Sequence, residues 1–402
     1  MSAPLSVAEA RAAMLAAVAV LESESVALPL ALHRVLAAPI LSTRDQPPFA
    51  VSAMDGYAIR SADAPGPLAL IGESAAGHGF GGVCGAGQAV RISTGAAIPQ
   101  GADTVVIQED VRRDGDTVEV PAAKPNANIR PQGGDFKAGI ELLSPGRRLD
   151  GVALSLAAAA GQGQLAVVKK PRIAILCSGD ELVPPGAVPG PWQIFESATF
   201  GVAALVSEWG GLPHKLAIEQ DDIDGIARAA DEGLFSSDLL VVIGGASVGD
   251  HDHARPALVT LGLKLQVEKV AVRPGKPTWF GATPIGPVLG LPGNPASALV
   301  CAHLFLRPLL EKMLGRDPEA VTKFRKARLA RALPANGPRE HYLRAMMESD
   351  ANGQMTVRSF EDQDSSLHSV FAAANGLIRL APNAPAMAEG VLVDVLSLGG
   401  SP

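Results

Sequence analysis

LLVVIGGASVGDHD, residues 239–252, is the stretch that decides the fold. It begins with an apolar run of strand length, Leu239 to Ile243, and then breaks into consecutive glycines. This pattern is typical of a buried strand that opens into a loop whose backbone can approach a ligand closely. We expect a phosphate as the ligand, because successive backbone N–H groups bind anions. The candidate phosphate-binding residues are Gly244, Gly245, Ser247 and Gly249.

Charged residues follow this loop in two groups. Asp250 and Asp252 stand at alternate positions, which suits a hard cation such as Mg²⁺ that bridges to phosphate oxygens. Arg273 and Lys276 flank Pro274-Gly275 in the turn RPGKP. A planar guanidinium and a compact ammonium on a stiff turn are the donors that an oxyanion site requires.

The stretch GLPGNPAS, residues 290–297, predicts the start of a long apolar helix, and helix N-termini attract anions through unpaired N–H groups. Each feature also has an ordinary structural explanation: a tight turn after a strand, a surface turn with solvated charges, a simple helix start. Their succession within one domain's length favours the binding interpretation. The residues at this helix start are Pro292, Gly293, Asn294, Pro295 and Ser297.

From Pro171 onward, strand and helix patterns alternate. Alternation of this kind predicts right-handed βαβ crossovers and a mostly parallel sheet covered on both faces. Ligands bind such sheets beyond the carboxyl ends of the strands, where Gly179, Asp180 and Glu181 also fall. The predicted helices are 197–209, 222–234, 254–261 and 295–314, and the predicted strands include RIAIL, HKLAI, LLVVI and LQVEKVAV.

Bulk properties exclude several classes of protein. A length of 402 residues suggests two to four domains, and a net charge of −7 gives no electrostatic footprint for nucleic acid. Cysteines 84, 177 and 301 are odd in number and widely spaced, which argues for a reducing compartment and buried thiols. The N-terminus has no signal-peptide pattern, and no apolar run reaches membrane-spanning length. We therefore expect a cytoplasmic protein.

The rest of the chain predicts additional parts. Ser6 and Glu9 form a capping-box pattern for a helix that runs to about Leu21, and a second short helix is expected from Ala31 to Ala38. Short β-rich runs between residues 66 and 143 predict a small antiparallel β domain, and further short strands after Val321 predict another. The predicted division is 1–48 plus 144–170 as an elongated lobe, 49–143 as an inserted β domain, 171–320 as the α/β domain and 321–402 as the C-terminal β domain.

The succession of motifs resembles the molybdopterin molybdenumtransferases, the family of MoeA and the gephyrin E-domain. Small departures from the family pattern are Ala246 for Val, Arg273 for Lys, Cys177-Ser178 where Thr is common and Ala198 where Asn is common. The resemblance extends to SAMDGYAIR (52–60), RISTGAAIP (91–99), ADTVVIQED (102–110), NIRPQGGDF (128–136) and CSGDEL (177–182).

The resemblance implies a multidomain α/β plus β protein: a doubly wound, mostly parallel MogA-like domain, an elongated mixed lobe, an inserted small β domain and a C-terminal β-barrel. It also implies the reaction, in which molybdate is inserted into adenylylated molybdopterin, with Mg²⁺ as cofactor and AMP released.

Family motifs assign roles to individual residues, each with a local alternative. Asp55-Gly56 is an ordinary turn pair, Glu196 suits the dipole of a helix start, and Asp221-Asp222 is an N-cap pair for the next helix. By resemblance, the catalytic residues are Asp55, Thr94, Asp221, Asp252 and Lys276, with Asp221 and Asp252 holding Mg²⁺. Substrate contacts are assigned to Glu196, Gly244, Gly245, Ser247, Gly249, Asp250, Lys269, Arg273, Pro292, Gly293, Asn294, Pro295, Ser297, Arg344 and Ser365, and a similar role suits Arg130, Gln132 and Asp135.

The resemblance further implies a homodimer whose active site is composite, with Asp55 and Thr94 supplied by the neighbouring subunit. Expected partners are a MogA-like adenylyltransferase and downstream cofactor-processing proteins or apo-molybdoenzymes, but neither nucleic acid nor membrane. Two other functions remain open: a Mg²⁺-dependent enzyme that hydrolyses nucleotides or transfers nucleotidyl groups, and a molybdopterin-binding scaffold.

Overall fold

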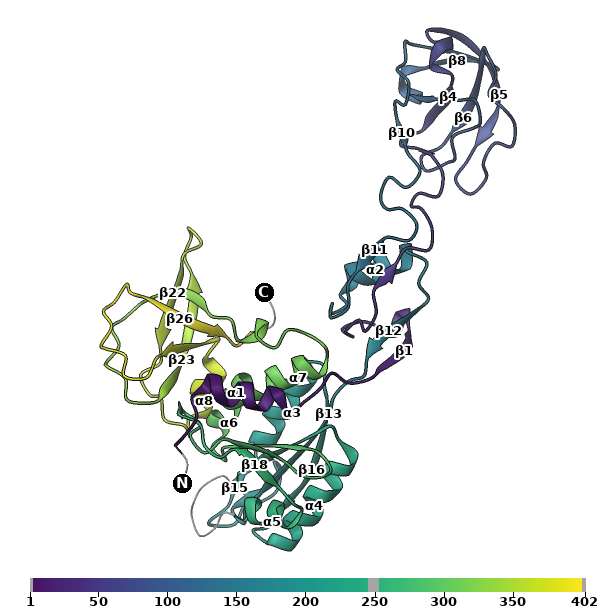
Figure 1. Ribbon diagram of the computed structural model, residues 1–402. Helices are drawn as coiled ribbons and strands as arrows, with labels where there is room; N and C mark the ends of the chain where they lie inside the picture. The colour runs from purple at the N-terminus through teal and green to yellow at the C-terminus, as the bar shows by residue number, and fades with distance from the viewer. Residues whose placement is uncertain (1–2, 245–252, 400–402) are drawn as a thin grey trace. The chain divides into compact units, whose positions relative to one another are not determined.

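The computed structural model describes residues 3–244 and 253–399 (Figure 1). Contacts divide the chain into two compact units. Unit 1 comprises residues 1–24, 33–37 and 167–402, and unit 2 comprises residues 25–32 and 38–166. The predicted four-part division is finer than this and stays a prediction.

Unit 1 is built on a six-stranded sheet with the order β16-β13-β17-β21-β20-β18. Its first four strands are parallel, and β20 and β18 continue it in antiparallel pairing, so the predicted mostly parallel sheet is confirmed. The strands are β13 (Arg172–Ser178), β16 (Leu212–Glu219), β17 (Leu239–Ile243), β18 (Lys264–Val267), β20 (Trp279–Ala282) and β21 (Pro287–Leu291).

Helices cover both faces of this sheet (Figure 1). Alternate residues of β13 point to opposite faces, so Ile173 and Ile175 join one core cluster while Ala174 and Leu176 join the other. The first core is covered by α1 (Val7–Ala16), α3 (Ala198–Glu208), α6 (Pro295–Cys301) and α7 (Arg307–Met313), and the second by α4 (Ile223–Ser236) and α5 (Ala254–Thr260). A π-helical turn, Ala302–Leu306, joins α6 to α7, so the predicted long helix is confirmed.

The C-terminal strands close into a barrel. Strand β23 pairs with both β24 and β25, which completes the ring β23-β24-β22-β26-β25. The short strand β19 (Val272–Arg273) adds to β23 in parallel and sets Arg273 opposite His341. The RPGKP turn is therefore attached directly to the barrel. The barrel elements are β22 (Arg325–Leu329), β23 (Glu340–Ser349), β24 (Met355–Ser359), β25 (Gly376–Leu380) and β26 (Leu392–Ser397), with α8 (His368–Ala373) between β24 and β25.

Unit 2 contains a six-stranded sheet with the order β7-β4-β6-β5-β9-β8. The predicted small antiparallel β domain departs from that prediction at one pair, because β5 and β6 run parallel while the other pairs are antiparallel. The glycine-rich segment 75–87 is long enough for the crossover that a parallel pair needs. The sheet strands are β4 (Gly56–Ile59), β5 (Gly66–Ser74), β6 (Gln88–Ile92), β7 (Thr104–Ile107), β8 (Arg112–Asp114) and β9 (Thr117–Val120).

Shorter elements complete the two units. Helix α2 (Gly151–Ala159) is capped by Asp150, whose Oδ1 accepts from the Ala153 N–H at 2.8 Å. The two-residue or short ladders are β1 (Ser23–Ala27) with β12 (Gln164–Val168), β2 (Ile40–Leu41) with β11 (Glu141–Leu143), β3 (Val51–Ser52) with β10 (Ile129–Arg130), and β14 (Leu182–Val183) with β15 (Ile194–Phe195).

Three sequence predictions of local structure are wrong. The capping box of α1 forms as predicted, but the helix ends at Ala16 and not near Leu21. No helix forms over 31–38, because His33 has a left-handed φ of 64° and the Val35 carbonyl accepts from the Val168 N–H at 2.9 Å. The predicted strand LQVEKVAV is divided into β18 and β19, which join different sheets.

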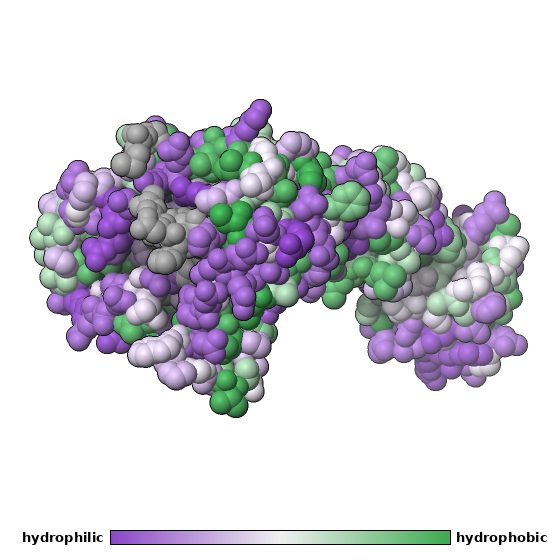
Figure 2. Space-filling view, turned by 90° about the horizontal axis from the view of Figure 1, so that it is seen from below, coloured by the Kyte–Doolittle hydropathy of each residue, from purple (hydrophilic) through white to green (hydrophobic). Residues whose placement is uncertain are grey.

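The surface of the described residues is mixed. Polar and charged side chains dominate the face in Figure 2, and apolar side chains form small separate patches. All three cysteines are buried and free, as predicted. Every helix in the described ranges is too short or too polar to cross a membrane.

Candidate functional site

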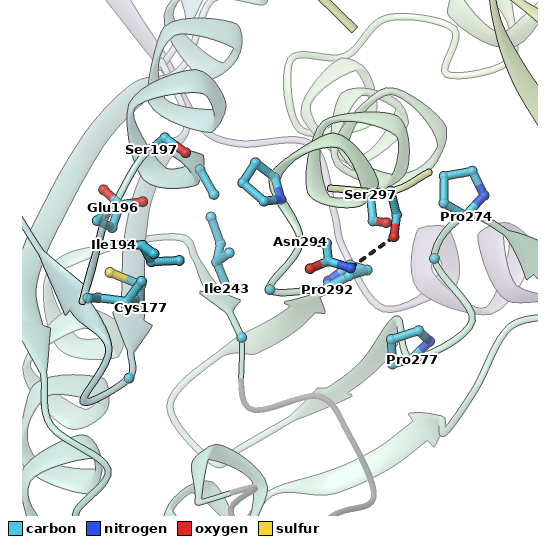
Figure 3. Close-up of a pocket in the computed structure, with 18 of the residues that line it drawn as sticks. Cys177, Ile194, Glu196, Ser197, Ile243, Pro274, Pro277, Pro292, Asn294 and Ser297 are labelled. Atoms are coloured by element: carbon cyan, nitrogen blue, oxygen red, sulfur yellow. Dashed lines mark hydrogen bonds between the residues drawn. The ribbon is translucent and has the colours of Figure 1, made fainter. Parts of the chain in front are cut away.

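A cavity of about 770 Å³ lies in unit 1 at the carboxyl ends of β13 and β17. The end of β17 is where the sequence predicted a ligand-binding loop, and the start of α6 and the RPGKP turn face the same space (Figure 3). The predicted site residues that line the cavity are Glu196, Asp221, Gly244, Arg273, Lys276, Pro292, Gly293, Asn294, Pro295, Ser297 and Ser365.

Cations form one wall of this cavity. Arg273 and Lys276 are exposed, and within residues 3–244 and 253–399 neither is paired with a carboxylate. Arg339 joins them, and its Nη1 donates to the Val272 carbonyl at 3.4 Å. Burial and, after it, the charges of Arg273, Arg339 and Arg344 lower the pKa of His341 to about 4. The wall therefore carries positive charge that an anionic ligand would offset.

The start of α6 forms the floor. Gly293 lies so close to Gly244 that a Cβ on Gly293 would stand 3.4 Å from the Gly244 Cα. Asn294 Nδ2 donates to Ser365 Oγ at 2.9 Å, which ties the helix start to a loop of the barrel domain (Figure 3). Ser297 is buried in the first turn of α6. N–H groups, an amide and two hydroxyls thus converge near the cations.

The acidic side is described only in part. Asp221 lines the cavity, and its backbone N–H donates to Asp180 Oδ1 at 3.1 Å. The described residues hold no group of three or more His, Cys, Asp and Glu side chains that could bind a metal. A single carboxylate such as that of Asp221 still fits Mg²⁺, which usually takes one or two carboxylates and completes its shell with water and substrate phosphate. The predictions for Gly245, Ser247, Gly249, Asp250 and Asp252 fall outside the described residues.

Two other side chains of the cavity wall have structural partners that limit their chemistry. Glu196 accepts from the Thr199 N–H at 2.7 Å and from the Thr199 hydroxyl, so its carboxylate caps α3. Burial, followed by the charge of Glu196, raises the pKa of Cys177 to about 12. The Cys177 thiol is therefore protonated at neutral pH and is a poor nucleophile.

Arg344 and Lys269 lie outside the cavity wall. Arg344 is 1% exposed, and its Nε and backbone N–H both donate to Gln363 Oε1, at 3.2 and 2.9 Å. Arg344 Nη1 donates to the Leu367 carbonyl at 3.2 Å, so this side chain holds the loop that carries Ser365. Lys269 uses its carbonyl to accept from the Leu5 N–H at 3.1 Å.

Asp55 and Thr94 belong to unit 2 and contact each other. The Thr94 N–H and hydroxyl donate to Asp55 Oδ1 at 2.6 and 3.0 Å. These two hydrogen bonds, the backbone one first, lower the pKa of Asp55. Unit 2 also has its own cavity of about 690 Å³, lined by Arg130 and Asp135 among others, whereas Gln132 donates to Asp45. The predicted residues of unit 2 thus form local clusters of their own.

Sequence reasoning missed several residues of the main cavity. Arg339 reaches it because β19 pairs with β23, a contact between distant segments that no local pattern signals. The exposed apolar pair Ile194-Phe195 lines another side. The feature of the sequence that could have indicated this pair is an apolar dipeptide that follows a Pro- and Gly-rich loop. Ser178, Ser197, Gln363 and Asp364 are further polar residues of the cavity that sequence reasoning missed.

Fold and cavity together define a multidomain α/β protein with a cleft at the carboxyl ends of parallel strands, one wall of which is cationic. Family models agree with this architecture: residues 5–161 match the "MoeA N-terminal region (domain I and II)", 174–312 the "Probable molybdopterin binding domain" and 326–398 the "MoeA C-terminal region (domain IV)". The chain belongs to the MoeA family of molybdopterin molybdenumtransferases.

Relatives of known name match over most of the chain. A molybdopterin molybdenumtransferase of Nostoc sp. is 36% identical over 333 residues, which are 80% of this chain and 76% of that protein. The one of Haemophilus influenzae is 33% identical over 382 residues, which are 93% of each chain. The crystal structure of the molybdopterin biosynthesis MoeA protein from Pyrococcus horikosii superposes with a TM-score of 0.87 at 29% identity, covering 99% of this chain and 100% of that one.

Proposed function

We propose that this enzyme inserts molybdate into adenylylated molybdopterin and releases AMP. The observation that carries the proposal is the cavity itself, in which Arg273, Lys276 and Arg339 face the start of α6 and the carboxylate of Asp221. One substrate carries a phosphoanhydride and the other is an oxyanion. Binding both needs this combination of cations, N–H groups and a metal-binding acid. The names of the relatives support molybdopterin and molybdenum as the substrate class.

Each residue type has a physical role in this proposal. Arg273 and Lys276 hold the tetrahedral molybdate dianion, with the Ser297 and Ser365 hydroxyls as further donors. Gly244, with Gly245, Ser247 and Gly249 of the undescribed segment, takes the phosphate side through backbone N–H groups. Arg344 acts through the loop that it holds. Its role is to keep Ser365 beside Asn294, at the 2.9 Å contact described above.

Asp221 and Asp252 would hold Mg²⁺, which supplies charge neutralisation of the phosphoanhydride when it is bound. Asp55, whose lowered pKa keeps it ionised at neutral pH, and Thr94 are proposed to enter the cleft from the neighbouring subunit. The proposed active form is therefore a homodimer, and the compartment that we propose for it is the cytoplasm. A MogA-like adenylyltransferase would supply the substrate, and cofactor-processing proteins or apo-molybdoenzymes would receive the product.

The test is AMP release from adenylylated molybdopterin with Mg²⁺, measured with and without molybdate. We expect release that depends on molybdate. Turnover of ATP without molybdate would instead support a nucleotide-hydrolysing or nucleotidyl-transferring enzyme, and binding without release would support a scaffold.

Lys276→Met sharpens this test, because it removes a charge and nearly preserves the length of the side chain. A charge-assisted hydrogen bond contributes about 1.5–3 kcal/mol, so kcat/KM for molybdate should fall by about 10- to 150-fold. Lys323→Met is the matched control, since Lys323 is also exposed but lies outside the cavity wall. Equal activities of the two variants would remove Lys276 from the site.

A further inference from the structure

An arm of the chain, residues 182–195, stands beside the main cavity, which Leu182, Ile194 and Phe195 line. Its two ends are joined by the parallel pair β14–β15, in which Leu182 lies opposite Ile194 and Val183 opposite Phe195. The Ile194 N–H also donates to the Glu181 carbonyl at 2.7 Å. The arm therefore has a fixed base at the carboxyl end of β13, next to the site already described.

This arm exposes apolar and aromatic side chains. Ile194 and Phe195 are 60% and 49% exposed and line the main cavity. Figure 3 places Ile194 on the side of the cavity opposite to Pro274 and Pro277, which flank the cationic turn. Trp192 is 89% exposed and lines an adjoining cavity of about 510 Å³. A ligand with an anionic end and a flat ring matches a space that is cationic on one side and aromatic on the other.

Glu181 lies between the two cavities and lines both. A Cβ placed on Gly179 would come within 2.5 Å of Glu181 Oε2, so the carboxylate lies directly over the backbone at the end of β13. An ionised carboxylate only accepts hydrogen bonds, and its two oxygens match a pair of parallel N–H donors. A 2-amino-4-oxopyrimidine ring, as in a pterin, presents such a pair of donors on one edge. Adenine presents a donor beside an acceptor.

We propose that the arm is a ring subsite that takes the pterin of the substrate, with Phe195 and Trp192 against its face and Glu181 on its donor edge. The inference rests on the proposed function and adds to it which of the substrate's two rings lies here. The adenine is left to the rest of the cleft. Recognition by a charged acceptor also gives selectivity, because a ring without the donor pair would leave the carboxylate desolvated and unpaired.

The experiment uses GMP, AMP and inorganic phosphate as probes, because guanine shares the donor edge of a pterin and adenine does not. Calorimetry on the full chain measures the affinity for each. Acrylamide quenching measures the exposure of Trp192, whose emission is separable because Trp209 and Trp279 are only 6% and 0% exposed. We expect GMP to bind at least about tenfold more tightly than AMP and to protect Trp192 from quenching, whereas phosphate gives no protection. The Trp192→Phe variant lacks this emission, so the quenching that GMP prevents in the wild type can be assigned to Trp192.

Glu181→Gln should abolish the preference for GMP and leave the affinity for phosphate unchanged. Glu232→Gln, at an exposed position on α4 outside both cavities, should keep the preference. Equal affinity for GMP and AMP, an unprotected Trp192, or a Glu181→Gln variant that still prefers GMP would each overturn the ring subsite. Molybdate-dependent AMP release by the wild-type enzyme tests the proposed function separately, so failure of one proposal is distinguishable from failure of the other.

Discussion

At the scale of single residues, the cations of the cavity, Arg273, Lys276 and Arg339, form one of its walls. Arg273, Arg339 and Arg344 surround His341, and their charges, added to burial, keep the imidazole neutral at physiological pH. A neutral histidine does not add to the repulsion among the guanidinium groups. An oxyanion in the cavity would offset their charges, so we expect ligand binding to stabilise this part of the chain.

His303 gives a prediction of pH-dependent stability. It is 3% exposed and packs edge-on against Trp209 with ring centroids 5.1 Å apart. Burial, and then the charge of Arg307, lowers its pKa from 6.5 to about 3. Below pH 6.5 the unfolded chain therefore takes up a proton that the native state refuses, and stability is lost as the pH falls towards 3. Between pH 7 and pH 5 the loss from His303 is about 2 kcal/mol.

Urea unfolding of the wild type and of His303→Phe at both pH values measures this effect. The variant keeps an aromatic ring beside Trp209 and has no proton to gain. Between pH 7 and pH 5 its free energy of unfolding should therefore fall by about 2 kcal/mol less than that of the wild type. His368→Phe, a change at an exposed position of α8, is the control. Parallel pH dependences of the wild type and His303→Phe would contradict the prediction.

At the scale of elements, the RPGKP turn is fixed by its packing on α6. Gly275 has a φ of 115°, and a Cβ there would come within 2.2 Å of Cys301 Sγ. Cys301 is itself fully buried and accepts from the Thr278 hydroxyl at 3.2 Å, so it has little room to move. Glycine is thus needed both for its backbone conformation and for the close approach of turn and helix.

Gly275→Ala should therefore destabilise the chain by about 1–3 kcal/mol more than a glycine-to-alanine change that strains the backbone alone. Gly390→Ala is that reference, since Gly390 has a φ of 83° with no atom within 4 Å of its Cβ position. Urea unfolding midpoints of the two variants provide the comparison. Equal losses would show that the contact with Cys301 costs nothing.

Elements with a strong local signal could be predicted from the sequence. The apolar run of β17 and the N-cap Asp222 of α4, whose Oδ2 accepts from the Gly225 N–H at 2.7 Å, both formed as predicted. Features that depend on distant pairing could not be predicted. The position of Arg339 follows from the β19–β23 ladder, and the break near His33 follows from the contact of Val35 with Val168.

The candidate site was predictable to the same extent. Asn294 and Ser297 reach the cavity because α6 begins directly after β21, at the carboxyl end of the parallel strands. Arg273 and Lys276 reach it because the RPGKP turn connects β19 of the barrel to β20 of the sheet. The hydrogen-bond partners of the side chains could not be predicted from the sequence. The same acidic residue type serves two purposes, since Glu196 caps a helix with its carboxylate while Asp221 remains available at the cavity.

At the scale of the whole molecule, the proposed site needs groups from both compact units. Asp55 and Thr94 form their cluster in unit 2, and the cationic cavity lies entirely in unit 1. A composite site in a symmetric dimer makes a prediction that a site within one subunit does not.

Co-expression of Asp55→Asn and Lys276→Met subunits tests this prediction. Each variant alone should keep only a small fraction of the wild-type activity, but a mixed dimer would pair the intact Asp55 of one subunit with the intact Lys276 of the other. Random association then restores about a quarter of the wild-type AMP release. If each site were built from a single subunit, the mixture would be no more active than the single variants. Tagging the two variants differently allows the mixed dimers to be purified and assayed directly.

The short strand β19 also bears on how this chain can be divided. The C-terminal barrel takes up Val272–Arg273 as an additional strand, and its Tyr342, Leu377 and Leu396 belong to the same hydrophobic core as α6 and α7. A fragment ending at residue 312, where the central family match stops, would leave that core uncovered and the β19 backbone unpaired. A chimaera of two relatives should therefore take the barrel, residues 272–273 and the contacting surface of α6 and α7 from the same parent.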